Sequence, residues 1–285
     1  MKAIGKTLLL IGATSDIGRA TALVYAEAGW DVHLVGRRRE LVQREADDIV
    51  TRTGASVAAH ELDILDTGRF EEFLSTVSPL PDTAICVVGE LGEQARAERE
   101  LEHAAMVMRT NFEGPALMLG LLASRFAARG SGTIVGISSV AGDRGRGSNY
   151  VYGAAKAGLT AFLSGLRNRL FTAGVRVLTI KPGFVRTGMT DGMKLPPMLT
   201  AEPAEVAQRI FAVADGSKGG DVVYVRRIWY PLMAIIRGVP GTDLQKVAAV
   251  IEAGGTRGRL RCPSCRFFPR FDADRDLHPG RMGSR

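Results

Sequence analysis

The chain has 285 residues and a formal net charge of +7, and 46% of its residues are hydrophobic. This composition suits a substantial core in one large domain or two small ones. Residues 250–285 contain eight arginines and four acids, so a charge of +4 lies in this tail and only +3 in the rest of the chain. That remainder is too small to indicate nucleic acid binding, and we predict no nucleic acid partner.

The cysteines and the hydropathy pattern indicate the expected compartment. Cys86, Cys262 and Cys265 are too few for a disulfide framework and indicate a reducing compartment. Cys262-Pro-Ser-Cys265 has no second ligand pair, so no metal site is predicted there. No segment has the roughly 20 apolar residues that a membrane span needs, and the apolar start of the chain continues into a glycine-bearing turn instead of a cleavage site. We therefore expect a cytoplasmic protein.

The first predicted elements are a strand, a glycine-bearing turn and a helix. The apolar run Thr7–Ile11 predicts a strand buried on both faces, and a helical pattern then continues to Ala28. In such a turn, glycines let the backbone approach a phosphate and the N–H groups of the helix face the anion. The turn therefore predicts a dinucleotide phosphate site, or alternatively an ordinary strand-to-helix turn. The candidate residues are Gly12, Thr14, Ser15, Asp16, Ile17 and Gly18.

The second strand, Asp31–Val35, ends in a run of three arginines. Dinucleotide folds place a carboxylate near this point for the ribose hydroxyls of NAD. Here the arginines come first, with no acid before Glu40, which favours NADP(H) over NAD(H) and makes Arg37 the best candidate for the extra phosphate. The alternative is a solvated basic turn that begins the next helix. After a third strand, Ser56–Leu62, Asp63 is either an acceptor for the adenine amino group or a turn residue.

Strand and helix patterns continue to alternate along the chain. They predict an α/β protein with a three-layer, doubly wound parallel sheet, a Rossmann fold, in a single domain over residues 1–240. A helix over residues 241–254 and a disordered basic tail over 255–285 follow. The further expected helices are Glu40–Thr53, Val107–Arg129, Tyr150–Phe171 and Glu202–Ala214, and the further strands are Thr83–Val88, Gly132–Ser138, Val175–Ile180 and Asp221–Val225.

Tyr152 and Lys156 are four residues apart in a predicted helix and so share one face. A nearby ammonium favours the ionised phenol, and at an effective dielectric of ~20 one cation supplies about 3–4 kcal/mol. This would lower the pKa of Tyr152 from ~10 towards neutrality. Ser139, just past an apolar run, can hydrogen-bond a substrate carbonyl, and Asn111 either repairs backbone geometry or holds a water. The alternative for the pair is an exposed Tyr–Lys contact on an amphipathic helix.

Two later segments have unusual compositions. The methionines and prolines of Met189–Met198 suit a mobile lid over a site, or alternatively an ordinary long connection. Residues 228–237 are too short to span a bilayer, but they can lie at a membrane interface with Trp229 and Tyr230 at headgroup level. The alternative is a helix, over 228–240, that docks on its own core or on a second subunit.

Taken in order, these motifs resemble the short-chain dehydrogenases/reductases over roughly residues 5–240. The resemblance implies hydride transfer from a nicotinamide cofactor to a carbonyl, with Asn111, Ser139, Tyr152 and Lys156 as a catalytic tetrad. It implies a homodimer or homotetramer that pairs through the helices predicted near Val107–Arg129 and Tyr150–Phe171. It also places a further set of residues at the cofactor, together with Tyr152 and Lys156: Gly89, Pro182, Gly183, Val185 and Thr187.

The chain departs from the family pattern at two places. Asp16 stands where the family usually has glycine, and an acid so near a diphosphate is unfavourable unless it caps the helix or pairs with Arg19. Residues 86–89, Cys-Val-Val-Gly, replace the usual Asn-Asn-Ala-Gly. The contacts that those asparagines make in the family are therefore not expected here.

Residues 138–153 and 175–187 are similar to the decaprenylphosphoryl keto-pentose reductases. That similarity implies a lipid-linked 2-keto sugar as substrate, a flavin oxidase as partner, and a peripheral location at the inner face of the membrane. Two alternatives remain open. One is an enzyme of this fold acting on a soluble sugar, steroid or acyl ketone, and the other is a cofactor-binding scaffold or sensor without catalysis.

Overall fold

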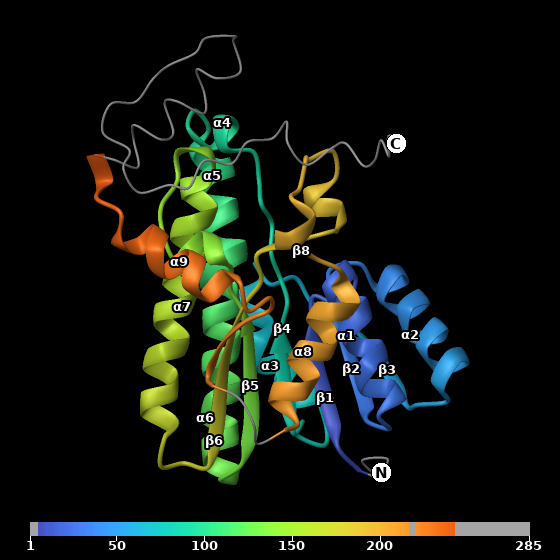
Figure 1. The fold of residues 1–285 in the computed structure, drawn as a ribbon. Helices are drawn as coiled ribbons and strands as arrows, with labels where there is room; N and C mark the ends of the chain where they lie inside the picture. Colours follow the sequence, from blue (N-terminus) through green and yellow to red (C-terminus); the bar gives the residue numbers. More distant parts are fainter. Residues whose placement is uncertain (1–4, 217–219, 243–285) are drawn as a thin grey trace, which may run out of the picture. The chain divides into compact units, whose positions relative to one another are not determined.

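The computed structural model describes residues 5–216 and 220–242 (Figure 1). Its centre is a seven-stranded sheet in the order β3-β2-β1-β4-β5-β6-β9, in which every neighbouring pair is parallel. The strand order reverses between β1 and β4, and parallel sheets bind ligands beyond the carboxyl ends of their strands at such a point. The strands are β1 Thr7–Ile11, β2 Asp31–Gly36, β3 Val57–Glu61, β4 Thr83–Cys86, β5 Gly132–Ile137, β6 Val175–Lys181 and β9 Val222–Tyr224.

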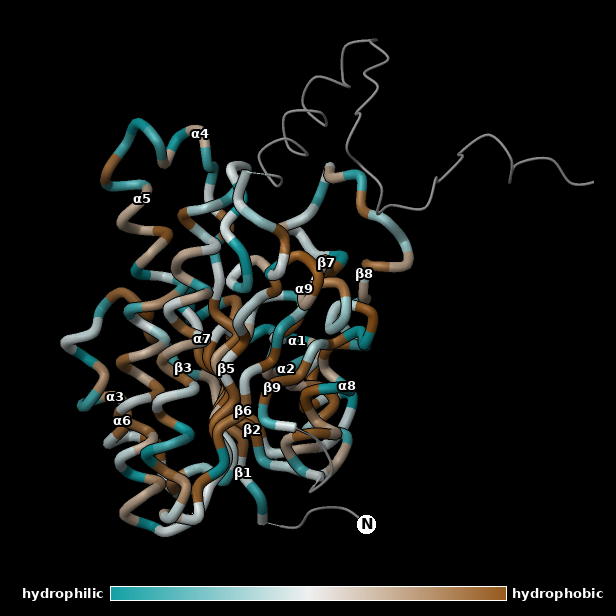
Figure 2. The backbone as a smooth tube through the Cα atoms, turned by 60° about the vertical axis from the view of Figure 1, so that its left-hand side comes forward, coloured by the Kyte–Doolittle hydropathy of each residue, from teal (hydrophilic) through white to brown (hydrophobic). Residues whose placement is uncertain are grey.

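Helices cover both faces of this sheet, as Figure 1 shows. Leu8 and Leu10 of β1 pack on the side of α1, α2 and α8, whereas Leu9 and Ile11 pack on the side of α3, α6 and α7. Because both faces are dry, the strands have continuous apolar sequences, and Figure 2 shows the hydrophobic residues gathered along them. The helices are α1 Asp16–Glu27, α2 Arg39–Thr53, α3 Phe70–Thr76, α4 Gln94–Ala97, α5 Leu101–Met108, α6 Gly114–Arg129, α7 Tyr150–Leu170, α8 Pro203–Ala214 and α9 Trp229–Gly238.

The doubly wound parallel sheet predicted from the sequence is confirmed, and most boundaries differ by one or two residues. The expected helix over Val107–Arg129 is confirmed, although it is not one regular α-helix, because a π-helical turn over Arg109–Glu113 lies between α5 and α6. Pro115 lacks the N–H that an α-helix would use to bond the carbonyl of Asn111. The backbone widens there, and the side-chain amide of Asn111 donates to the carbonyl oxygen of Val107 at 2.8 Å.

In the carboxyl-terminal half, one feature of the structure was not predicted from the sequence, and some predicted features lie outside the described residues. A second, two-stranded parallel sheet pairs β7, Phe184–Val185, with β8, Thr200–Ala201. The segments are too short to leave a sequence pattern. Residues 5–238 of the described chain belong to one compact unit, and no helix among the described residues is long and apolar enough to cross a bilayer. Residues 243–285, with Cys262, Cys265, the tail and nearly all of the expected helix 241–254, lie outside the described residues.

Candidate active site

A crevice at the carboxyl ends of the strands holds two adjoining cavities, of about 160 and about 650 Å³. Thr14, Ser15 and Gly89 line both of them. The smaller cavity adds Arg37 and Asp63. Of the residues predicted to be catalytic or cofactor-binding, only Gly18 and Asn111 line neither cavity. Those that line the larger cavity include Asp16, Ile17, Ser139, Tyr152, Lys156, Pro182, Gly183, Val185 and Thr187.

The glycine turn brings the start of α1 close to the end of β1. Gly12 has a φ of +95°, and its N–H donates to the carbonyl oxygen of Val35 at 2.9 Å. Ser15 caps the helix, since its hydroxyl accepts from the N–H of Gly18 at 3.1 Å. A Cβ on Gly18 would lie 2.4 Å from the carbonyl oxygen of Gly12, so no larger residue fits. The positive end of α1 therefore faces the crevice, as a diphosphate site requires.

Asp16 makes neither of the contacts expected for it. Ser15 is the capping residue, and Arg19 pairs with Glu45 at 2.8 Å. Instead, the Asp16 carboxylate accepts a hydrogen bond from the N–H of Gly188 at 2.9 Å. The two residues are 172 positions apart in the chain. The acid in the glycine turn therefore holds the segment that follows Thr187 against the mouth of the larger cavity.

Arg37 and Asp63 lie at the other end of the crevice. Arg37 directly follows β2 and is exposed at the smaller cavity. The carboxylate of Asp63 accepts from the N–H of Leu65 at 2.9 Å and so forms a local turn. The turn role is therefore observed for Asp63. A contact between its side chain and adenine stays a prediction.

Ser139, Tyr152 and Lys156 meet in the larger cavity. The Ser139 hydroxyl is close enough to the phenol of Tyr152 to act on its pKa. Lys156 is 3% exposed, and its ammonium donates to the carbonyl oxygens of Val88 at 3.2 Å and Ile137 at 3.1 Å. It lies 5.8 Å from the ring centroid of Tyr152. The alternative of an exposed Tyr–Lys pair is therefore excluded.

Burial controls the ionisation of both groups. It raises the pKa of Tyr152 to about 12, while the hydrogen bond from Ser139 acts in the opposite direction. The expected fall in the pKa of Tyr152 is therefore wrong in the chain by itself. Burial also lowers the pKa of Lys156 to about 8, and the electrostatic interaction with Cys86 acts in the opposite direction. For Tyr152, the cost of removing a phenolate from water outweighs the effect of Ser139.

Asn111 repairs backbone geometry, one of the two roles expected for it. Its amide nitrogen donates to the carbonyl oxygen of Glu90 at 2.6 Å, and its oxygen accepts from the N–H of Glu90 at 3.2 Å. It thereby joins the π-helical turn to the loop after β4. A Cβ on Gly89 would stand 3.3 Å from the Asn111 oxygen and 3.5 Å from the Lys156 nitrogen, so the backbone of Gly89 packs close to both groups.

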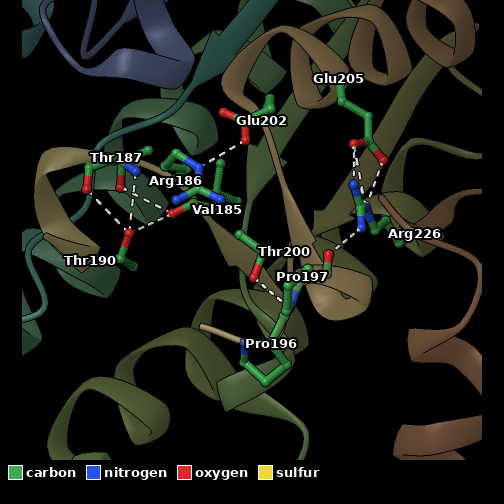
Figure 3. A network of polar contacts seen from close by, with 10 residues as sticks. All are labelled: Val185, Arg186, Thr187, Thr190, Pro196, Pro197, Thr200, Glu202, Glu205 and Arg226. Atoms are coloured by element: carbon green, nitrogen blue, oxygen red, sulfur yellow. Dashed lines mark hydrogen bonds and ion pairs between the residues drawn. The ribbon is translucent and has the colours of Figure 1, made fainter. Parts of the chain in front are cut away.

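The segment after Thr187 is anchored at both ends, as Figure 3 shows. At its start, the hydroxyl of Thr190 donates to the carbonyl oxygen of Val185 at 2.7 Å. At its end, Arg226 donates to the carbonyl oxygens of Pro197 at 2.9 Å and Met198 at 3.0 Å while its guanidinium pairs with Glu205. Sequence reasoning missed Arg226, because nothing in the pattern links residues so far apart. It also missed Glu90 and Leu91 in the larger cavity, which Met189 and Met193, from the segment expected to lie over a site, line as well.

Helix α9 docks on the core beside the cavity. A Cβ on Gly183 would lie 2.0 Å from the indole of Trp229, so the ring packs directly against the Pro182-Gly183 turn. The indole nitrogen donates to the carbonyl oxygen of Leu199 at 3.2 Å. One of the alternatives for residues 228–240, a helix docking on its own core, is thus observed for the face that carries Trp229 and Met233.

Comparison with known proteins identifies the family of this chain. The family model of the short chain dehydrogenases matches residues 6–196. An uncharacterised oxidoreductase of Mycobacterium tuberculosis is 33% identical over 237 residues, which cover 82% of this chain and 93% of that protein. One of Streptomyces coelicolor is 34% identical over 244 residues, with 82% and 93% covered.

A solved structure is similar as well. A Beutenbergia cavernae protein, whose name suggests an NAD(P)-dependent gluconate 5-dehydrogenase, was solved with NADP bound at low occupancy. It superposes with a TM-score of 0.72 at 27% identity, with 81% of this chain and 98% of that chain covered. The chain belongs to the short-chain dehydrogenase family and is an oxidoreductase.

We predict that the activity of the enzyme depends on the charge of Lys156. Its pKa is lowered from 10.5 to about 8, so the ammonium is present below that pH and lost above it. The value of kcat/KM for the cofactor reports groups of the free enzyme, so it should fall as the pH rises through about 8. Rates of carbonyl reduction between pH 6 and about 10 test this. A flat profile across that range would contradict it.

Proposed function

We propose that this enzyme is an NAD(P)H-dependent ketoreductase in which Tyr152 protonates the oxygen of a substrate carbonyl. The observation that carries the proposal is that Ser139, Tyr152 and Lys156 line one cavity, with the Lys156 ammonium 5.8 Å from the ring centroid of Tyr152. A phenol whose pKa is raised to about 12 stays protonated at neutral pH. This is the form that a proton donor needs.

The residues of the crevice fit a nicotinamide dinucleotide. The N-terminal end of α1 and the close-packed Gly12 and Gly18 suit a diphosphate. Two N–H groups of the Lys156 ammonium donate to the carbonyls of Val88 and Ile137, and the third is available for a ribose hydroxyl. When bound, the cofactor would supply the hydride.

The remaining groups of the tetrad would act through position and charge. Ser139 would orient the carbonyl oxygen towards Tyr152. Lys156 would favour the phenolate left after proton transfer, because a cation stabilises a nearby anion most strongly where water is excluded. Asn111 would keep the loop after β4 in place, since both polar atoms of its amide already bond Glu90.

We predict that Tyr152→Phe lowers turnover by about 10²- to 10⁴-fold, because it removes the proton donor alone. The affinity for NADPH should stay nearly unchanged, since the ring remains. Single-turnover hydride transfer and cofactor fluorescence titration measure the two quantities. Tyr150→Phe, two residues earlier at the exposed start of α7, is the matched control. Unchanged turnover in Tyr152→Phe would refute the assignment.

We propose that NADP(H) is preferred to NAD(H). Arg37 supports this, because it lies at the rim of the smaller cavity directly after β2, where the adenosine ribose of a dinucleotide would lie. A guanidinium binds a phosphate through two parallel hydrogen bonds, and a ribose hydroxyl offers no such partner.

We predict that Arg37→Ala weakens NADPH binding by about 10- to 100-fold, as expected for the loss of a charge-assisted hydrogen bond worth ~1.5–3 kcal/mol. NADH binding should change little. Dissociation constants for both cofactors, with Arg38→Ala as the neighbouring control, test this. Equal losses for NADPH and NADH would remove Arg37 from the phosphate site.

We further propose a lipid-linked keto-pentose as substrate and a peripheral position at the inner face of the membrane. Apolar side chains on α9 support this proposal, with Tyr230 65% and Ile235 61% exposed. Arg227 and Arg237 flank them and would favour an anionic surface. A soluble sugar, steroid or acyl ketone is the alternative. A 27% identical Chlamydia trachomatis relative is named a 3-oxoacyl-[acyl-carrier-protein] reductase.

We predict that the protein floats with vesicles containing anionic lipid and that Tyr230→Ser with Ile235→Ser reduces the bound fraction severalfold, because both apolar contacts with the bilayer are lost. Phe171→Ser is the matched control, since this apolar side chain is 86% exposed at the end of α7. Equal flotation of the double variant and the parent would contradict a membrane role for α9. It would favour the soluble substrates.

The partners stay predictions. Exposed Phe112 and Leu117, near the start of α6, are compatible with a homodimer or homotetramer. A flavin oxidase would be a partner only if the substrate is the lipid-linked sugar. A scaffold or sensor without catalysis would bind the cofactor but transfer no hydride, which the single-turnover measurement detects.

A further inference from the structure

A buried ion pair lies outside both cavities and joins three elements. The ammonium of Lys181, at the end of β6, donates to one carboxylate oxygen of Asp143. The hydroxyl of Tyr224, at the end of β9, donates to the other at 2.6 Å. The side chains of Lys181 and Asp143 are only 6% and 3% exposed. None of the three residues lines the crevice, so the cofactor and the substrate do not explain them.

Such a cluster is costly to bury. Two charges lose their hydration, and a well-packed apolar pair of similar size is often as stable. Burial, and then the hydrogen bond to Asp143, raise the pKa of Tyr224, so its hydroxyl remains a donor. Arg146, whose pKa burial lowers, also faces Asp143. Stability alone therefore gives a weak reason for placing this carboxylate here.

Asp143 ends the short turn that begins with Ser139. Ser139 is the N-cap and Asp143 the C-cap of a single 3₁₀ turn, Val140–Gly142, and the Ser139 hydroxyl accepts from the N–H of Ala141 at 3.1 Å. Only the three residues of this turn separate Asp143 from Ser139, so we expect a shift of Asp143 to be transmitted to Ser139.

The turn is held tightly against the helix that carries Tyr152. A Cβ on Gly142 would lie 2.7 Å from the backbone nitrogen of Ala157, and one on Gly153 would lie 2.9 Å from the carbonyl oxygen of Ala141. The backbones of the turn and of α7 therefore touch. One side of the turn rests on α7, and the ion pair holds its far end.

The same ion pair reaches the turn expected at the nicotinamide. Lys181 directly precedes Pro182-Gly183, and the N–H of Val140 donates to the carbonyl oxygen of Pro182 at 3.0 Å. The ion pair therefore links the turn carrying Ser139 to one wall of the larger cavity, which Pro182 and Gly183 line. Both walls would shift relative to Tyr152 if it were broken.

We propose that Asp143, held by Lys181 and Tyr224, is a positioning residue that sets the Ser139 hydroxyl against Tyr152. The proposal rests on the ketoreductase function proposed above. Asp143 lies outside the cavity, and by this proposal it controls how Ser139 and Tyr152 are placed inside the cavity. Misplacing a reacting group by about 1 Å can cost about 100-fold in rate, so a small movement of the turn is enough.

The first test is Asp143→Asn, which keeps the shape and removes the charge that holds Lys181. The rate of hydride transfer should fall by about 10- to 100-fold, while the dissociation constant for NADPH stays within about threefold. Tyr224→Phe leaves the ion pair in place and removes one hydrogen bond, so a smaller loss of several-fold is expected. Asp82→Asn is the control, because the Asp82 carboxylate accepts from the N–H of Thr7, the first residue of β1, at the opposite ends of the strands.

A double-mutant cycle separates positioning from a loss of stability. In a Ser139→Ala background, Asp143→Asn should cost less than about twofold, because the group it positions is already absent. A purely structural role would give the same loss in both backgrounds, and that result would overturn the proposal. Hydride-transfer rates within twofold of the parent in both Asp143→Asn and Tyr224→Phe would also overturn the proposal. If Asp143→Asn fails to fold, the same cycle with Tyr224→Phe decides.

The probe is the ketone that the parent enzyme reduces fastest with NADPH in a panel of soluble and polyprenyl-linked ketones. An inactive parent across that panel would overturn the proposed function, and this inference with it. An active parent whose variants show additive losses would overturn the inference alone.

Discussion

The site depends on the burial of one cation. Lys156 is 3% exposed, and its ammonium is held by two backbone carbonyls at the ends of β4 and β5. An unpaired ammonium in such a place loses much of its hydration, and its pKa falls to about 8 for this reason. The crevice therefore contains a positive charge that is poorly hydrated. An anion or a hydroxyl that approaches this ammonium stabilises its charged form. Tyr152, one turn earlier on α7, has its ring centroid 5.8 Å from that ammonium and is in position to use the charge.

Close packing of backbone around this cation leaves little freedom elsewhere. A Cβ on Gly89 would crowd the Asn111 oxygen, and Gly142 and Gly153 let the turn carrying Ser139 touch α7. The Asn111 amide joins the π-helical turn to the loop after β4. Each of these contacts is between backbones, or between a backbone and a short side chain. Because backbones packed this closely cannot move independently, a displacement at one point is passed to its neighbours. A buried ion pair at Asp143 can therefore control the position of the Ser139 hydroxyl.

The sequence predicted what short-range patterns encode. Thr7–Ile11 is a strand with its predicted bounds, because both faces of the sheet are covered and the run is continuously apolar. The meeting of Ser139, Tyr152 and Lys156 followed from the order of the motifs. The π-helical turn was missed because its apolar pattern still looked helical. The raised pKa of Tyr152 was missed because burial depends on the whole fold, whereas the spacing of Tyr152 and Lys156 shows only the cation.

Asp16 shows how a departure from the family pattern can be resolved only in three dimensions. An acid at the start of α1 is favoured by the helix dipole, and this carboxylate also bonds the N–H of Gly188. A diphosphate bound at the same helix end would be repelled by the acid. It would also be covered by the segment that the acid holds. The negative charge of Asp16 thus weakens diphosphate binding at this helix end, whereas its hydrogen bond to Gly188 helps to enclose the bound diphosphate. Because salt screens the charge at long range more than it weakens a short hydrogen bond, the balance between these effects shifts towards enclosure as ionic strength rises.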